Sequence, residues 1–355
     1  MTILNRSKVP KRVLKIMDSM MQVQTKMIFD YVNKHEEPNI NFLNLWQKIL
    51  KYNDKFMRKE GTLDDYKGLL TKEEMLYLAK LFRYMSDKVA ELEQQKFPIS
   101  EDVKIINVIA NDVPAEWQVV PNAMDDHVIL YIHGGGFVMG SPNDHRLLTV
   151  EIGYKTRFKI LSIDYRLAPE NPFPAGLEDC VKTYKWLLSE GCEPKNIIIA
   201  GDSAGGNFTL STLLKLKDEN ITLPAGAICL SPSTDLTGSD DTFFKNAETD
   251  PVLADVGLFW WIEAYLGDND PYNPYISPLW GDLKGLPPIL LQVSSTEMLY
   301  GDSKRFYEKA KAEGVDVKLE VWDDMPHVFQ GFGLRALPEA REALDNIAKF
   351  VKKIV

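Results

Sequence analysis

The chain has 355 residues, of which 45% are hydrophobic, and it carries a formal net charge of −10. This length and composition allow one large or two ordinary domains with a substantial core, and they exclude a disordered or fibrous protein. The negative charge disfavours nucleic acid, whose phosphates would be repelled, and it provides no basic face for anionic lipid.

Residues 1–100 show helical periodicity and almost no strand signal. Apolar residues recur at helical spacing over 13–31 and 42–56, and a capping box of Thr71 and Glu74 begins a third helix. We expect these helices to form an N-terminal cap region that packs on the following domain; an adaptable lid and a dimer surface are the alternatives. Their polar faces mix Lys with Asp and Glu, which disfavours binding to a membrane surface.

After this region the periodicity changes to that of strands. Two β-rich runs, 103–109 and 117–120, predict an antiparallel pair at one edge of a sheet, with Pro114 and Pro121 closing the turns. Strand and helix signals then alternate to the end of the chain, which is typical of a parallel sheet covered on both faces. We expect one α/β domain over residues 101–355. Its further strands are predicted at 127–133, 160–164, 197–200, 225–230, 289–294 and 317–322, and its helices at 145–157, 175–189, 204–217, 303–312 and 337–355.

An aromatic-rich segment interrupts the alternation at about residues 240–275. It contains Phe259, Trp260 and Trp261 in succession, so it is apolar around more of its circumference than a surface helix would be. We expect this insertion to pack against the N-terminal helices as the second part of a cap.

Ser203 stands between a buried strand and a helix in the pattern Gly201-Asp202-Ser203-Ala204-Gly205. Glycines two positions before and after a serine suit a turn that has no room for side chains, and such a turn places the hydroxyl at the carboxyl end of the sheet. The pattern favours a nucleophile, although a plain Gly-rich connection has the same appearance. A base, an acid and an oxyanion site are therefore needed to distinguish the two.

His327 is the candidate base among five histidines, because it follows the last predicted strand at the edge where Ser203 emerges. Glu297 follows the preceding strand and is the candidate orienting acid. Asp302 is its competitor, but it stands at the start of a helix, where it can act as a cap instead. The order serine, acid, histidine along the chain is that of α/β-hydrolases.

A glycine triplet follows the first strongly buried strand. Glycines let backbone N–H groups approach a ligand closely, although a lone triplet also suits a flexible turn. We expect the triplet 134–136 to form an oxyanion hole, with the N–H of Ala204 as a further donor at the Ser203 turn.

Five motifs resemble those of the hormone-sensitive-lipase-like carboxylesterases, family IV of the α/β-hydrolase superfamily. They are HGGGF at 133–137, DYRLAPENPFPAGLED at 164–179, GDSAGG at 201–206, SPLW at 277–280 and MPHVF at 325–329. The resemblance covers roughly residues 101–355. It implies an α/β fold of the α/β-hydrolase type, with a mostly parallel central sheet, helices on both faces and a helical cap.

The same resemblance implies hydrolysis of short- to medium-chain acyl esters through an acyl-enzyme, without a cofactor or metal. It matches the family's nucleophile to Ser203 and its histidine to His327. It matches the family's oxyanion donors to Gly135, Gly136 and Ala204, with Gly134 at the border of the site. The family's acid position often reads Asp-Pro-Leu, and here it reads Glu297-Met298-Leu299, so the acid is the site residue on which the chain departs from the family.

The sequence therefore predicts a serine carboxylesterase whose partner is a small-molecule ester. Two alternatives are an amidase or peptidase that uses the same residues, and a non-catalytic receptor with a hydrolase fold. His327 disfavours the receptor, because a related plant hormone receptor lacks that histidine. We expect activity to fall as His327 becomes protonated at about pH 6 to 7.

Cysteine usage and the N-terminus bear on location. Cys180, Cys192 and Cys229 lack metal-site spacing, and their odd number argues against a disulfide framework. The first 15 residues lack the apolar run of a signal peptide, and no run of about 18 apolar residues occurs. We expect a cytoplasmic protein without stable membrane insertion, and we leave a homodimer open.

Overall fold

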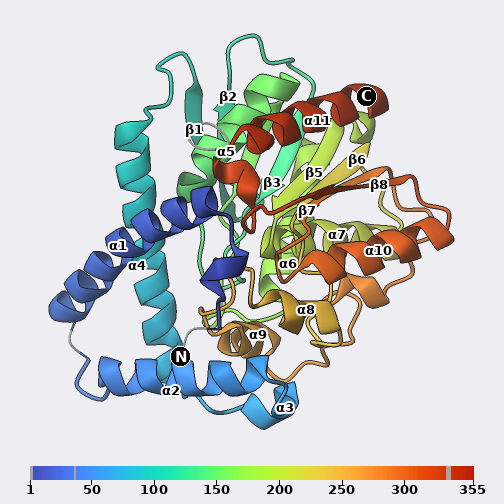
Figure 1. The fold of residues 1–355 in the computed structure, drawn as a ribbon. Helices are drawn as coiled ribbons and strands as arrows, with labels where there is room; N and C mark the ends of the chain where they lie inside the picture. The colour runs from blue at the N-terminus through green and yellow to red at the C-terminus, as the bar shows by residue number, and fades with distance from the viewer. Residues whose placement is uncertain (1–2, 36, 333–336) are drawn as a thin grey trace.

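The structure, a computed structural model, describes residues 3–35, 37–332 and 337–355 (Figure 1). Its strands are β1 (Lys104–Ala110), β2 (Val113–Val119), β3 (Val128–Ile132), β4 (Lys159–Ile163), β5 (Ile197–Asp202), β6 (Gly226–Leu230), β7 (Ile289–Ser294) and β8 (Val317–Trp322). They form one sheet in the order β1-β2-β4-β3-β5-β6-β7-β8. The pairs β1–β2 and β2–β4 are antiparallel, and the remaining neighbours are parallel, which confirms the predicted mostly parallel sheet.

The antiparallel pair lies at the sheet edge as predicted, but its turn differs from the prediction. Asn111 and Asp112 make the turn with positive φ angles of 52° and 69°, a conformation that Asn and Asp tolerate better than most residues. Pro114 was expected to close this turn and instead lies within β2, opposite Ile109. Pairing with both β1 and β4 extends β2 over residues of low strand propensity, because tertiary contacts outweigh propensity.

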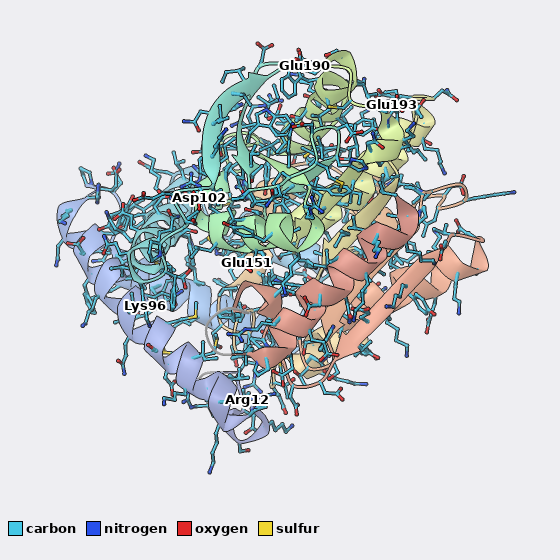
Figure 2. The ribbon with its side chains drawn as sticks, turned by 90° about the horizontal axis from the view of Figure 1, so that it is seen from above. Arg12, Lys96, Asp102, Glu151, Glu190 and Glu193 are labelled. Carbon is cyan, nitrogen blue, oxygen red and sulfur yellow. The ribbon has the colours of Figure 1, made fainter. Side chains whose placement is uncertain are left out.

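Helices cover both faces of the sheet. They are α5 (Pro142–Thr156) and α11 (Pro338–Ile354) on one face, and α6 (Ala175–Ser189), α7 (Ala204–Asp218) and α10 (Tyr300–Ala312) on the other. On β3, Ile129 and Tyr131 pack under α5 and α11, whereas Leu130 and Ile132 belong to the larger core on the opposite face. Figure 2, in which Glu151 marks α5, shows α5 and α11 running side by side. Because all five residues of β3 are buried, this strand is a rigid support for the turn that follows it.

The remaining helices gather beyond the carboxyl ends of the strands (Figure 1). They are α1 (Lys11–Lys34), α2 (Phe42–Met57), α3 (Leu63–Tyr66), α4 (Lys72–Lys96), α8 (Asp241–Asn246) and α9 (Leu258–Leu266). Separate 3-10 turns occur in other parts of the chain, at Arg6–Lys8, Pro194–Asn196, Pro278–Trp280 and Phe329–Phe332. The predicted capping box of Thr71 and Glu74 begins α4. None of the described helices combines the length and the apolar character needed to cross a bilayer.

The aromatic insertion packs on the N-terminal helices, as expected. Phe56 of α2 meets Phe243 of α8 edge to face, and Phe82 of α4 meets Trp261 of α9 in the same way, with ring centroids 6.3 and 5.6 Å apart. Hydrogen bonds add to this contact, since Asn53 donates to the carbonyl oxygen of Ala254 at 2.8 Å. The two segments therefore form one layer over the same edge of the sheet.

Arg83 of α4 binds to residues of the sheet domain. Its guanidinium donates to the carbonyl oxygens of Val138 and Ala168, at 2.7 and 2.8 Å, and pairs with both carboxylate oxygens of Glu170. Val138 lies two residues after the glycine triplet, so α4 contacts the chain next to the predicted oxyanion site.

Candidate active site

Ser203 occupies a sharp turn between β5 and α7. Its φ of 52° and ψ of −117° are unusual for a residue with a side chain, and such strain persists only where the surroundings enforce it. A methyl group at Gly205 would overlap the carbonyl oxygen of Ile132, and one at Gly201 would overlap the carbonyl of Gly205. The flanking glycines are therefore required by close backbone contacts, and they place Ser203 at the N-terminal end of α7.

The three predicted site residues lie within hydrogen-bond distance of one another. Nε2 of His327 is 3.0 Å from Oγ of Ser203, and Nδ1 of His327 is 3.1 Å from Oε1 of Glu297. Glu297 follows β7 and His327 follows β8, so both reach the carboxyl edge of the sheet where Ser203 lies. The Glu297 carboxylate is fully buried, and His327 is 6% exposed.

Asp302 does not contact His327. Its carboxylate accepts hydrogen bonds from the backbone N–H groups of Thr234 and Asp235, at 2.7 and 2.9 Å, and lies 3.4 Å from Arg305. It therefore anchors the loop after β6 to α10, and the structure places Glu297, not Asp302, beside the histidine.

Glu297 is held by groups other than His327. Its Oε2 accepts hydrogen bonds from the hydroxyl of Ser231 at 2.8 Å and from the N–H of Ser294 at 3.1 Å. Burial raises the pKa of Glu297 above its ordinary value, although the charge of His327 partly opposes this. These contacts orient the carboxylate toward Nδ1. A carboxylate there favours the tautomer in which Nδ1 carries the hydrogen and donates it to Glu297, which leaves Nε2 free to accept the proton of Ser203.

The pKa of His327 is raised above its ordinary value. Burial alone would lower it, but the charge and hydrogen bond of Glu297 raise it, and the charges of Asp250 and Asp202 add to the rise. The site therefore favours the protonated imidazole that forms when the ring takes a proton from Ser203.

The glycine triplet lies next to the Ser203 turn. Gly136 and Ala204 line one cavity together with Ser203. The N–H of Gly134, however, donates to Oδ1 of Asp202 at 3.1 Å. Gly134 therefore lies beside the expected oxyanion site and is not one of its N–H donors, because its hydrogen is already bound. A methyl group at Gly136 would overlap the ring of Trp261, so α9 packs directly on this turn.

A small, mainly apolar cavity of about 50 Å³ lies beside Ser203. The apolar side chains that line it are Phe56, Phe137, Leu236, Phe243, Leu253, Leu258, Trp261, Ile262 and Leu299. The carboxylate of Asp235 also lines it, but Arg305 and Ser239 bind that carboxylate at 2.9 and 2.6 Å. The cavity therefore suits an uncharged, apolar group next to the serine.

A second histidine cluster, which the sequence analysis missed, lies next to the Ser203 turn. Nδ1 of His145 is 2.5 Å from Asp144, and its Nε2 is 3.2 Å from Asp202. The available signal was that Asp202 immediately precedes Ser203 and that the Asp144-His145 pair follows the glycine triplet closely. Among the residues that the structure describes, no group of three or more His, Cys, Asp or Glu side chains is arranged to hold a metal ion.

Comparison with known proteins places these observations in a family. Residues 129–331 match a family model described as alpha/beta hydrolase fold. An acetyl-hydrolase from Streptomyces hygroscopicus is 40% identical over 67% of this chain and 79% of its own length. An esterase from Acinetobacter venetianus is 39% identical over 73% of this chain and 85% of its own length.

Two solved structures are similar over most of the chain. One is an esterase from the bacterial hormone-sensitive lipase family, 38% identical, with a TM-score of 0.74 over 87% of this chain and 98% of that one. The other is EstE5 soaked by p-nitrophenyl butyrate, also 38% identical, with a TM-score of 0.73 over 86% of this chain and 98% of that one.

Proposed function

The chain belongs to the alpha/beta hydrolase family, within it to the hormone-sensitive-lipase-like esterases, and from this premise we propose a catalytic role for each residue of its site. The protein is a serine carboxylesterase that hydrolyses carboxylic esters. We assign the nucleophile to Ser203, the base to His327 and the orienting acid to Glu297. The observation that carries this assignment is the continuous line of contacts at 3.0 and 3.1 Å through the imidazole of His327.

The reaction proceeds in two acyl transfers. Nε2 of His327 takes the hydroxyl proton of Ser203 as Oγ attacks the ester carbonyl carbon, and the carbonyl oxygen becomes an oxyanion. As the oxyanion collapses, the bond to the alkoxy group breaks and His327 donates its proton to the leaving alcohol. Water then attacks the acyl-enzyme in the same way, which releases the carboxylic acid and returns the proton to Ser203.

The N–H groups of Gly135, Gly136 and Ala204 are the proposed oxyanion donors. The presence of Gly136 and Ala204 around the cavity that contains Ser203 supports this assignment. N–H groups fixed by the backbone stabilise charge that develops in the transition state without having to reorient.

The apolar cavity is the proposed acyl site, and its apolar lining suits the short- to medium-chain acyl groups that the family resemblance implies. Trp261 closes it against Gly136, so Trp261→Ala should enlarge it. We expect this variant to raise kcat/KM for p-nitrophenyl octanoate relative to p-nitrophenyl butyrate by about tenfold, since each added methylene contributes to binding once there is space for it. An unchanged ratio would place the acyl chain elsewhere.

The decisive test is hydrolysis of p-nitrophenyl butyrate by the wild-type protein and by Ser203→Ala. The variant should lose about a million-fold in turnover, because no other group supplies the attacking oxygen. Ser233→Ala, which removes a second serine from the same cavity, is the matched control and should keep its activity. A matched butyryl anilide measured beside the ester tests amide hydrolysis, for which we expect much slower turnover.

Three further proposals concern organisation. We assign residues 1–100 and 240–275 to one cap over the catalytic domain of residues 101–355, which the aromatic contacts across the two segments support.

A cytoplasmic location agrees with the free thiols of Cys180, Cys192 and Cys229. A homodimer agrees with Ile109 of the edge strand β1, which is 64% exposed, and light scattering would test it.

A further inference from the structure

Asp202 connects the serine turn to the glycine triplet. Its carboxylate is buried, and Oδ1 accepts hydrogen bonds from the hydroxyl of Tyr131 at 2.8 Å and from the N–H of Gly134 at 3.1 Å. A methyl group at Gly134 would overlap this carboxylate, so the two residues pack without a gap. Because Asp202 is also the chain neighbour of Ser203, its position determines how the nucleophile and the triplet lie relative to each other.

His145 is the charge partner of Asp202. Nε2 lies 3.2 Å from Oδ2 of Asp202, and Nδ1 lies 2.5 Å from Asp144, whose other oxygen accepts a hydrogen bond from Ser86 of α4. An imidazole can donate to two carboxylates at once only as the cation. Burial alone would lower the pKa of His145, but the charges of Asp202 and Asp144 raise it well above its ordinary value.

Two further titratable groups in this cluster, His133 and Tyr131, stay uncharged near neutral pH. His133, after β3, has its ring centroid 5.5 Å from that of His145, and burial together with repulsion by His145 lowers its pKa to about 4. Burial, reinforced by the charge of Asp202, raises the pKa of Tyr131 well above its ordinary value. Near neutral pH the cluster therefore holds one cation, His145, between two carboxylates.

We propose that His145 is a positioning residue for ester hydrolysis: as the cation between Asp144 and Asp202, it keeps the Asp202 carboxylate on the N–H of Gly134 and so holds the turn 134–136 in place beside Ser203. The proposal rests on the proposed function, because this turn matters to the rate only if an oxyanion forms next to it. His145 also neutralises a carboxylate that would otherwise repel the oxyanion from close range.

The test is the kinetics of His145→Gln on p-nitrophenyl butyrate. We expect kcat to fall about 10- to 100-fold, because a displaced oxyanion turn weakens transition-state binding. We expect KM to stay within about twofold, since the ground-state ester does not depend on these donors. His127→Gln is the matched control: His127 immediately precedes β3, at the end opposite the glycine triplet, and also pairs with an aspartate, Asp126, at 2.7 Å.

A second variant separates charge from packing. Adding Asp202→Asn to His145→Gln removes the unpaired carboxylate but keeps an acceptor for the N–H of Gly134. We expect the double variant to recover part of the lost kcat, an interaction that a purely structural role would not produce. A further fall in kcat would overturn the proposal, and so would a folded His145→Gln with the kcat of His127→Gln or with a loss expressed entirely in KM.

Tyr131→Phe decides the question if His145→Gln does not fold. It keeps the ring and removes only the hydrogen bond to Asp202, and we expect kcat to fall several-fold with KM unchanged. An unchanged kcat would overturn the proposal. Failure of the proposed function is a separate result: it would appear as full activity in Ser203→Ala, whatever the His145 variants do.

Discussion

His327 and His145 both lie in buried clusters next to the Ser203 turn, yet their rings are engaged differently. His327 has a carboxylate, Glu297, at Nδ1 and leaves Nε2 facing Oγ of Ser203 at 3.0 Å. His145 has a carboxylate at each nitrogen, Asp144 at 2.5 Å and Asp202 at 3.2 Å. A general base needs an unprotonated nitrogen within reach of the proton that it removes, so only the first arrangement suits a base.

His145 shows that a buried histidine beside a carboxylate is not by itself evidence of a catalytic base. Here the one carboxylate beside His327 orients the ring, whereas the two carboxylates beside His145 favour its cationic form. Mutation of each cluster should therefore have a different size of effect.

The largest effect is expected for His327→Ala. Without the imidazole, Ser203 keeps its proton, and kcat for p-nitrophenyl butyrate should fall about a million-fold. The measurement is steady-state hydrolysis beside His145→Gln. If both variants lost activity equally, the distinction between base and positioning residue would be wrong.

Glu297→Gln should come next, with kcat reduced about ten-thousand-fold, because the amide favours the wrong tautomer of His327. Asp302→Asn is the matched control on the same segment. Burial and the charge of Asp235 raise the pKa of Asp302 to about 7, so the neutral amide resembles a form that it already adopts. We expect its kcat to stay within about tenfold of wild type. A larger loss in Asp302→Asn than in Glu297→Gln would return the acid role to Asp302.

The pH dependence distinguishes the two rings in the wild-type enzyme. Glu297 and its neighbours raise the pKa of His327. As the pH is lowered, kcat/KM should therefore begin to fall before the pH reaches the ordinary histidine pKa of about 6.5. Below the pKa of His327 it should drop about tenfold per pH unit. The sign follows from the base, which is active unprotonated and is lost as pH falls. His145 should add no step at the ordinary histidine value, because the charges of Asp202 and Asp144 raise its pKa well above that value. A profile that is flat from pH 5 to 8 would contradict His327 as the base.

The smallest effect on activity is expected for Ser86→Ala, which removes the α4 hydroxyl from Asp144. We expect the free energy of unfolding to fall by about 1 to 2 kcal/mol, as for a hydrogen bond to a charged group, while kcat changes less than tenfold. Urea unfolding and steady-state kinetics on the same preparation would measure both. An unchanged free energy of unfolding would mean that the hydrogen bond between Ser86 and Asp144 does not stabilise the protein.

Much of the fold could be predicted because its signals are local. The strands 289–294 and 317–322 and the helix 175–189 lie where the local pattern placed them. The first is a mostly apolar run, the second alternates apolar and charged residues, and the third has apolar residues at helical spacing. The second strand was predicted too short, because its Pro114-Ala115-Glu116 start is a strand only through pairing with β1 and β4. Pairing partners far along the chain leave no mark on local propensity.

The site divides in the same way. The sequence by itself indicated the Ser203 turn, because an apolar run, the Gly-x-Ser-x-Gly pattern and a helical pattern follow one another directly. The contact of Gly205 with the carbonyl oxygen of Ile132 on β3 belongs to the tertiary structure. Only the tertiary structure decided that Glu297 and not Asp302 reaches His327, that Asp202 takes the N–H of Gly134, and that His145 lies between two carboxylates. These contacts join residues 30, 68 and 57 positions apart, and the packing of separate strands and helices sets their distances.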